Sequence, residues 1–115
     1  MNHAQAATAM SERNLDDQIR RLAEDLGLLR YHTWNSQRSP SGFPDLVLIG
    51  GSGILFRELK RERYDPTPMQ QAWLSALENA GGDSGVWRPS DLLSGRIARE
   101  LTAIAAVSSA PGSGT

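Results

Sequence analysis

The stretch "SGFPDLVLIGGSGILFRELK", residues 41–60, decides the fold. Apolar residues stand on both sides of "GGSG" (50–53), and short apolar runs separated by a glycine-rich turn are typical of a β-hairpin. The pattern predicts strands at about 45–49 and 54–60. A phosphate-binding loop should lead into a helix, so "GGSG" is interpreted as a hairpin turn.

The hairpin brings charged side chains together. A turn centred on Gly51-Ser52 pairs Ile49 with Ile54 and places Asp45 opposite Glu58. Directly opposed Cβ atoms lie about 5 Å apart. Lys60 stands on the same face as Glu58, because side chains two residues apart on a strand share a face.

The rest of the chain predicts three helices and two more strands. An apolar stripe follows the expected N-cap Ser11 and ends at Gly27, which predicts the first helix. Similar reasoning predicts helices at 68–80 and 91–106 and strands at 28–34 and 85–88. The fold class is therefore α/β, a small mixed β-sheet flanked by helices in the order αβββαβα. The strand before the second helix and the strand after it are expected to pair in parallel.

Length and composition indicate one small domain. The chain has 115 residues, and a single core is expected in residues 11–107, with a flexible N-terminus at 1–10 and a disordered tail at 108–115. The chain has no cysteine, which excludes disulfides, thiolate nucleophiles and cysteine zinc sites. Neither a membrane span nor a signal peptide is predicted, so we expect a cytoplasmic protein.

The formal net charge of −1 is unevenly distributed. Residues 30–64 carry six basic and three acidic side chains, whereas both flanking segments are acidic. A basic middle segment can bind a polyanion through one face. The alternative is an ordinary solvated surface of mixed charge.

Two opposed carboxylates repel each other, and a cation between them reverses that cost. Oxygen ligands without His or Cys favour Mg²⁺ or Mn²⁺ over zinc. A water acidified by such a metal is a nucleophile, and Lys60 can stabilise charge on a phosphate. In the alternative interpretation, Lys60 and Glu58 form a surface ion pair and Asp45 caps a strand end.

The motif itself resembles a known superfamily. Pro44-Asp45, a short hairpin, and then Glu58-Leu59-Lys60 resemble the core of the PD-(D/E)xK nucleases, which have a restriction-endonuclease-like fold. The sequence around this motif points to one family within the superfamily. "GFPDLVLI", "ELKRE", "TPMQQAWLSALENAGG" and "VWRPSD" together resemble the VRR-NUC (virus-type replication-repair nuclease) family over residues 11–104.

The resemblance implies a role for each residue of the motif. Asp45 and Glu58 would be metal ligands, the backbone carbonyl of Leu59 would be a third ligand, and Lys60 would be the catalytic lysine. The cofactor would be Mg²⁺ or Mn²⁺.

Two more residues match the family pattern. Glu12 matches the helical acid that would approach the metal directly or through water. Gln70 matches the glutamine that would support the site or the scissile phosphate. The connection "RERYDP" (61–66) departs from the pattern, because it is bulkier and more charged than the family's glycine-containing one.

Several residues near the motif are expected to contact nucleic acid. Arg38 precedes the active-site strand, and Arg61 and Arg63 follow Lys60. Trp34 is a candidate for base stacking, and His32 for substrate contact. Each of the arginines can also be an ordinary solvated side chain.

The functional expectation is a metal-dependent, structure-selective DNA endonuclease, a Holliday-junction resolvase that acts as a homodimer and comes from a phage. A C2 dimer presents two sites to a four-way junction. The third helix, or Trp73 and Trp87, is expected to form the interface. The alternatives are a nuclease on flap or linear DNA and a non-catalytic DNA-binding or replication accessory module.

Overall fold

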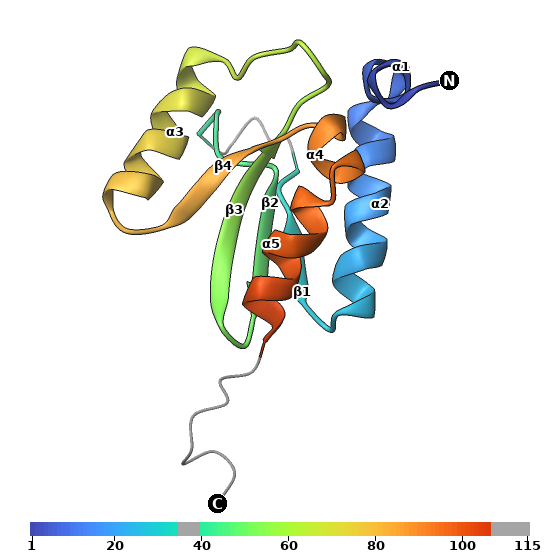
Figure 1. Ribbon diagram of the computed structural model, residues 1–115. Helices are drawn as coiled ribbons and strands as arrows, with labels where there is room; N and C mark the ends of the chain where they lie inside the picture. The colour runs from blue at the N-terminus through green and yellow to red at the C-terminus, as the bar shows by residue number, and fades with distance from the viewer. Residues whose placement is uncertain (35–39, 107–115) are drawn as a thin grey trace, which may run out of the picture.

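The computed structural model describes residues 1–34 and 40–106 (Figure 1). Their helices and strands are, in chain order, α1 His3–Ala9, α2 Glu12–Asp25, β1 Leu29–His32, β2 Leu46–Gly50, β3 Gly53–Leu59, α3 Pro68–Asn79, β4 Asp83–Trp87, α4 Pro89–Leu93 and α5 Arg96–Ala105. The predicted mixed sheet flanked by helices is confirmed. No helix within these residues is both long enough and apolar enough to span a membrane.

The four strands form one sheet in the order β1-β2-β3-β4. The β1–β2 and β2–β3 pairs are antiparallel, and β3 pairs in parallel with β4 after the α3 crossover, as predicted. The register of the hairpin is also as predicted, with Ile49 opposite Ile54 and Leu46 opposite Arg57. Continued by one pair, this register brings Asp45 next to Glu58.

The two faces of the sheet have different coverings. α2 and α5 lie on one face, where the core contains fully buried residues such as Leu15, Leu48 and Leu101 (Figure 1). α3 lies on the other face, where Phe43 packs edge-on against both Phe56 and Trp73. Asp45, Glu58 and Lys60 lie at the end of β3 that is nearest to the start of α2.

The hairpin turn also holds the end of α5. Ser52 donates its backbone N–H to the carbonyl of Ile104 over 2.9 Å. A Cβ at Gly50 would lie 2.2 Å from the same carbonyl oxygen, so only glycine permits this approach. "GGSG" therefore forms a helix-docking turn.

The N-terminal segment differs from the expectation. Residues 1–10 were expected to be flexible, but α1 occupies most of them. Asn2 and Gln5 form a capping box, and Ala7 is buried where α1 packs against α4. A seven-residue helix shows too little periodicity to predict from sequence, and its stability comes from this packing and capping.

The third predicted helix, expected as one element at 91–106, is two helices. α4 ends at Leu93, and Gly95 takes a φ of 85°, in the left-handed region, before α5 begins. A left-handed residue cannot continue an α-helix. Gly95 is the feature of the sequence that could have indicated the break.

Candidate active site

The side chain of Asp45 and the end of β3 are joined by a hydrogen bond. Leu59 donates its N–H to Asp45 Oδ2 over 2.8 Å. On the other side, Lys60 donates its own N–H to the carbonyl of Trp87 on β4 over 3.1 Å. Two neighbouring segments therefore fix the backbone at Leu59-Lys60, and with it the directions of the flanking side chains.

Glu58 is a buried carboxylate. The residue is 2% exposed, and its Oε1 atom has no hydrogen-bond partner among the described residues. Burial raises the pKa of Glu58 to about 8, helped by the charge of Asp45 and a hydrogen bond with it. An unpartnered acid oxygen in the interior is costly, so this arrangement needs a proton or a cation to be stable.

Lys60 supplies part of the positive charge that the buried Glu58 carboxylate needs. Its Nζ lies 3.6 Å from Glu58 Oε2, and its side chain is only 14% exposed. Lys60 lowers the pKa of Glu58, but less than burial and Asp45 raise it. The Asp45–Glu58–Lys60 group therefore keeps a net affinity for positive charge.

These residues fit a hard divalent cation. Asp45 and Glu58 offer carboxylate oxygens, one of them unpartnered, which is the donor set that Mg²⁺ and Mn²⁺ prefer. Within residues 1–34 and 40–106, no three His, Cys, Asp or Glu side chains are close enough to form a metal cluster by themselves. The exposed Glu12 is therefore not a third member of a preformed cluster, although its charge also raises the pKa of Glu58.

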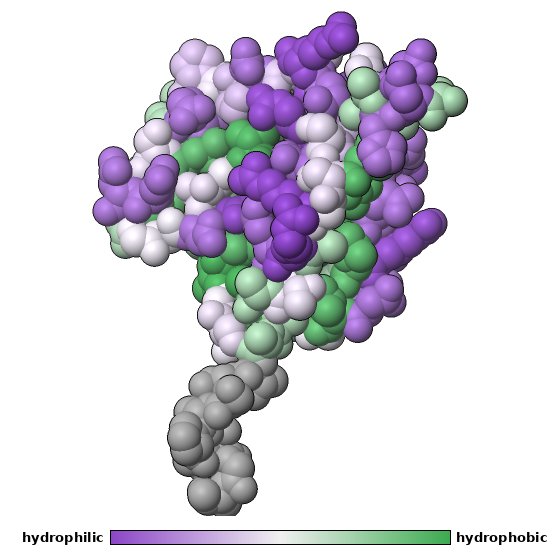
Figure 2. Space-filling view, in the orientation of Figure 1, coloured by the Kyte–Doolittle hydropathy of each residue, from purple (hydrophilic) through white to green (hydrophobic). Residues whose placement is uncertain are grey.

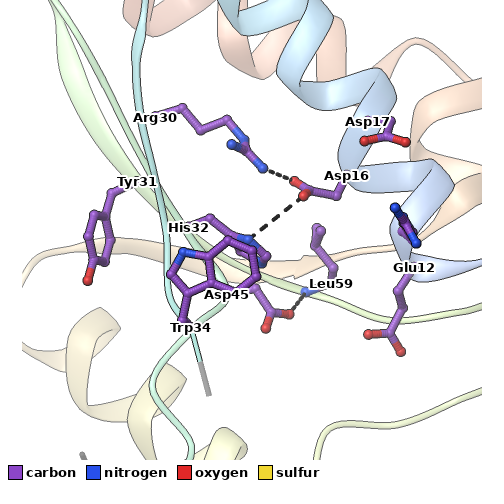
Figure 3. Close-up of a pocket in the computed structure, with 10 residues that line it drawn as sticks. Glu12, Asp16, Asp17, Arg30, Tyr31, His32, Trp34, Asp45 and Leu59 are labelled. Atoms are coloured by element: carbon purple, nitrogen blue, oxygen red, sulfur yellow. Dashed lines mark hydrogen bonds and ion pairs between the residues drawn. The ribbon is translucent and has the colours of Figure 1, made fainter. Parts of the chain in front are cut away.

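A hollow of about 850 Å³ lies between the first turns of α2 and the end of β1 (Figure 3). Its floor reaches Asp45 and Leu59, and Glu12 stands at its α2 side. Asp16 pairs with Arg30 across 2.5 Å and approaches His32 Nδ1 at 4.0 Å. Basic and acidic side chains therefore line the approach to the candidate metal ligands.

Asp16 and Arg30 were not predicted as site residues. Asp16 lies one turn after Glu12 on α2, and Arg30 lies two residues before His32 on β1. Each therefore shares a face with a residue that was predicted. That spacing could have identified them, but the pairing of α2 with β1 is a tertiary contact that spacing alone does not supply.

A second hollow of about 740 Å³ lies on the other side of the β1 end, against α3. Asp45, Tyr31 and Trp34 line both hollows. Gln70 lines the second one, and its Oε1 accepts the Thr67 backbone N–H over 2.9 Å in a capping box. The predicted site glutamine thus also caps α3.

The other residues that were predicted to contact nucleic acid do not lie in one place. His32 and Trp34 are stacked at a tilt, with ring centroids 4.8 Å apart, at the wall of the first hollow. Arg61 donates to the Thr8 carbonyl over 3.4 Å and packs over Tyr64, so it also holds α1 in place. Arg63 is exposed with a φ of 67°. The predicted contact Arg38 lies outside the described residues.

Two solved structures are similar to this chain. The first, named "VRR_NUC domain", is 28% identical, covers 70% of this chain and 91% of its own, and superposes with a TM-score of 0.56. The second, named "VRR_NUC domain protein", is 16% identical, covers 86% of this chain and 98% of its own, and has a TM-score of 0.61. The chain has the VRR-NUC fold. The family resemblance predicted from the motifs is therefore confirmed. No family model and no curated protein matches.

In this VRR-NUC fold, the motif residues Asp45, Glu58 and Lys60 lie together where β2 begins and β3 ends. The hydrophobic spacing predicted the strands, and the register then placed the acids. Their roles as ligands and catalyst remain predictions.

Proposed function

We propose that the chain is a metal-dependent endonuclease that hydrolyses phosphodiester bonds in DNA. The observation that carries the proposal is Glu58, a buried carboxylate with an unpartnered oxygen beside Asp45 and Lys60. Lys60 pairs with Oε2 of Glu58, which leaves Oε1 available as a ligand. The similarity to VRR-NUC structures supports the same reaction class.

Asp45 and Glu58 would hold Mg²⁺ or Mn²⁺, with the carbonyl of Leu59 as a further oxygen. When bound, the cation would supply a Lewis acid for the phosphate and a water of lowered pKa. Asp45 needs no rearrangement for this role, because the Leu59 N–H already holds its carboxylate. Glu12, across the hollow on α2, would act through water.

Lys60 would stabilise the charge that develops on the phosphate. Its ammonium is mostly withdrawn from solvent, where a charge acts more strongly than it does in water. Gln70 would support the site from the α3 side, since its Oε1 is fixed by Thr67 while its amide nitrogen can donate. Arg30 and His32, together with Trp34, would contact the DNA strand that enters the first hollow.

We propose that the protein acts on branched DNA as a homodimer. Trp87 and the apolar stripe of α5, which were predicted for the interface, are buried in the core, whereas Trp73, the other predicted residue, is only partly buried. Another surface fits better. Leu29, Ile49 and Ile54 form one row across β1, β2 and β3, and they are 69%, 38% and 43% exposed. Figure 2 shows apolar surface over β3 between α3 and α5.

The cytoplasmic location and phage source stay predictions.

The test is a cleavage assay on labelled four-way junction, flap and linear duplex with Mg²⁺, Mn²⁺ or EDTA. Paired symmetric nicks in the junction alone, abolished by EDTA and in Lys60→Ala, support a resolvase. Equal cutting of all substrates indicates a general nuclease. Junction binding without any cutting indicates an accessory module. Sedimentation of Ile49→Asp beside wild type tests the dimer, and an unchanged mass excludes the row as its interface.

A further inference from the structure

We propose that the second hollow binds the unpaired bases of a single-stranded segment next to the scissile phosphodiester. The inference rests on the proposed nuclease function and deepens it, because it names the DNA structure that the site prefers. The expected ligand is a nucleobase, which has a flat aromatic face and, when it is unpaired, is not stacked as in a duplex.

The hollow has a rigid aromatic wall. Phe43 meets Trp73 edge-on at 5.3 Å, and Trp73 donates its indole N–H to the carbonyl of Ser41 over 3.1 Å. Gly42 has a φ of 98°, and a Cβ there would lie 2.7 Å from the backbone of Met69. The segment before β2 is therefore packed tightly against the first turn of α3, so this wall of the hollow is preformed.

The rim of the hollow exposes large apolar side chains to solvent. Trp34 is 76% exposed, Tyr31 is 62% exposed and Met69 is 52% exposed. Trp34 is held at one side by the His32 ring. Exposed aromatic residues beside a polar site are the stacking platforms that proteins use for single strands, where each stacked base contributes about 1–3 kcal/mol.

The charges of the two hollows are different. The first hollow contains the acids Glu12, Asp16, Asp17 and Asp45, but it also contains Arg13 and Arg30, which can contact the phosphate backbone. Among the described residues that line the second hollow, none is Lys, Arg or His, and Asp45 is acidic. A phosphate would be unfavourable there, whereas a neutral base is not. A hydrogen bond from the Gln70 amide nitrogen can then reach a base edge.

The two hollows meet at Asp45, a candidate metal ligand. Asp45, Tyr31 and Trp34 border both, so a strand whose phosphate lies in the first hollow can place the adjoining base in the second. A base inside a duplex has no free face for this, since its neighbours stack on both sides. The geometry therefore favours a nucleotide that is unpaired next to the cut.

The experiment compares a blunt duplex with the same duplex carrying a single-stranded thymidine arm, with 2-aminopurine at the first unpaired position. Binding is measured in EDTA by anisotropy and by 2-aminopurine quenching. We expect wild type to bind the armed duplex about tenfold more tightly and to quench the probe, as stacking of a single base would produce. Trp34→Ala should lose the preference, and Trp34→Phe should keep it because it retains a π-face.

Leu26→Ala, an exposed apolar residue at the end of α2, is the control and should keep the preference. Equal affinity of wild type for both duplexes overturns the proposal, and so does a preference that survives Trp34→Ala. A parallel cleavage assay in Mg²⁺ separates the two proposals. Cleavage without arm preference overturns only the base site, and arm preference without cleavage of any DNA overturns only the nuclease.

Discussion

Leu59 and Asp45 are joined by a hydrogen bond of 2.8 Å from the backbone N–H of one to the carboxylate of the other. The acid just before β2 is therefore oriented by β3, the strand that also carries Glu58 and directly precedes Lys60. Preorganisation of this kind keeps two carboxylates side by side even though they repel each other. The repulsion is part of why the pKa of Glu58 is raised.

Replacing Asp45 by Asn should show which effects depend on the hydrogen bond to Leu59 and which depend on the negative charge of Asp45. Asp45→Asn keeps an oxygen for the Leu59 N–H and removes the repulsion of Glu58, so we expect a fold at least as stable as wild type with Mn²⁺ binding lost. Asp45→Ala also loses the hydrogen bond and leaves the Leu59 N–H without its partner, so it should be about 1–3 kcal/mol less stable than the Asn variant. Calorimetric Mn²⁺ titration and urea unfolding measure the two effects. Unchanged Mn²⁺ affinity in Asp45→Asn would contradict the assigned ligand.

Glu58 should make stability fall as pH rises. Its pKa is about 8 in the folded protein and 4.5 in its ordinary environment. Between those values the folded state binds a proton that the unfolded state has released, so the free energy of unfolding decreases with increasing pH across this window. Urea unfolding in EDTA at several pH values measures the decrease. Glu58→Gln, which cannot ionise, should flatten it, and an equal slope in both proteins would exclude Glu58 as its source.

Mg²⁺ should restore the stability that the protein loses as pH rises. A cation bound to the folded state stabilises it, and the effect grows with pH because protons compete for Glu58. We expect a larger rise in melting temperature on adding Mg²⁺ at pH 8 than at pH 5.5. Glu58→Gln is the control and should show little rise at either pH. A rise that does not depend on pH would mean that the cation binds elsewhere.

Replacing Lys60 by Met should separate catalysis from metal binding. Lys60→Met removes a charge that is 3.6 Å from Glu58, so we expect DNA cleavage to fall about 10²- to 10³-fold while Mn²⁺ still binds. Arg99→Met removes an equal charge from an exposed site on α5 and controls for net charge. Single-turnover cleavage measures the rates. Equal losses in the two variants would mean that only long-range attraction of DNA is affected.

Local patterns predicted most of this fold. The hairpin, its register and the α2 stripe follow from spacing within 20 or fewer residues, and each agrees with the structure. The grouping of Asp45, Glu58 and Lys60 could be predicted because the hairpin register places Asp45 beside Glu58. The break at Gly95 was missed because the apolar stripe continues on both sides of it.

Long-range packing could not be predicted in the same way. α1 depends on its contact with α4, and the Asp16–Arg30 pair joins residues 14 positions apart on different elements. The α5 face and Trp87 were wrong as parts of the predicted dimer surface for a related reason. An apolar helix face can serve a core or an interface equally well, and only the structure shows that α5 serves the core.

Glu100 should be a stabilising residue remote from the site. It accepts hydrogen bonds from the buried Arg57 at 2.9 Å and from Trp87 at 3.0 Å. Burial by itself would raise the pKa of Glu100, but bonds from Arg57, Arg96 and Trp87 outweigh it and lower the pKa. The stabilisation is therefore present above the ordinary pKa and is lost as pH falls through the folded one.

Glu100→Ala leaves the Arg57 guanidinium with the exposed Asp83 as its remaining carboxylate partner. We expect a loss of about 3 kcal/mol in urea unfolding at neutral pH, the low end of the cost of breaking a buried ion pair, because Asp83 still compensates part of the Arg57 charge. Glu24→Ala breaks the exposed Arg20–Glu24 pair and should change stability by less than about 0.5 kcal/mol. Equal effects would mean that burial of Arg57 does not matter.

Gly50 should tolerate no side chain, although its strand position looks permissive. A Cβ there would lie 2.2 Å from the Ile104 carbonyl oxygen, so Gly50→Ala must push the end of α5 away from the hairpin and break the bond from Ser52. We expect a loss of about 1–3 kcal/mol in urea unfolding, the usual cost of overpacking. Gly85→Ala is the matched control in β4, where a Cβ meets nothing within 4 Å. It should leave stability unchanged or raise it by about 0.5 kcal/mol, because alanine has less freedom to lose on folding. If both substitutions have the same effect, the α5 end does not depend on the hairpin, and the turn is only a connection.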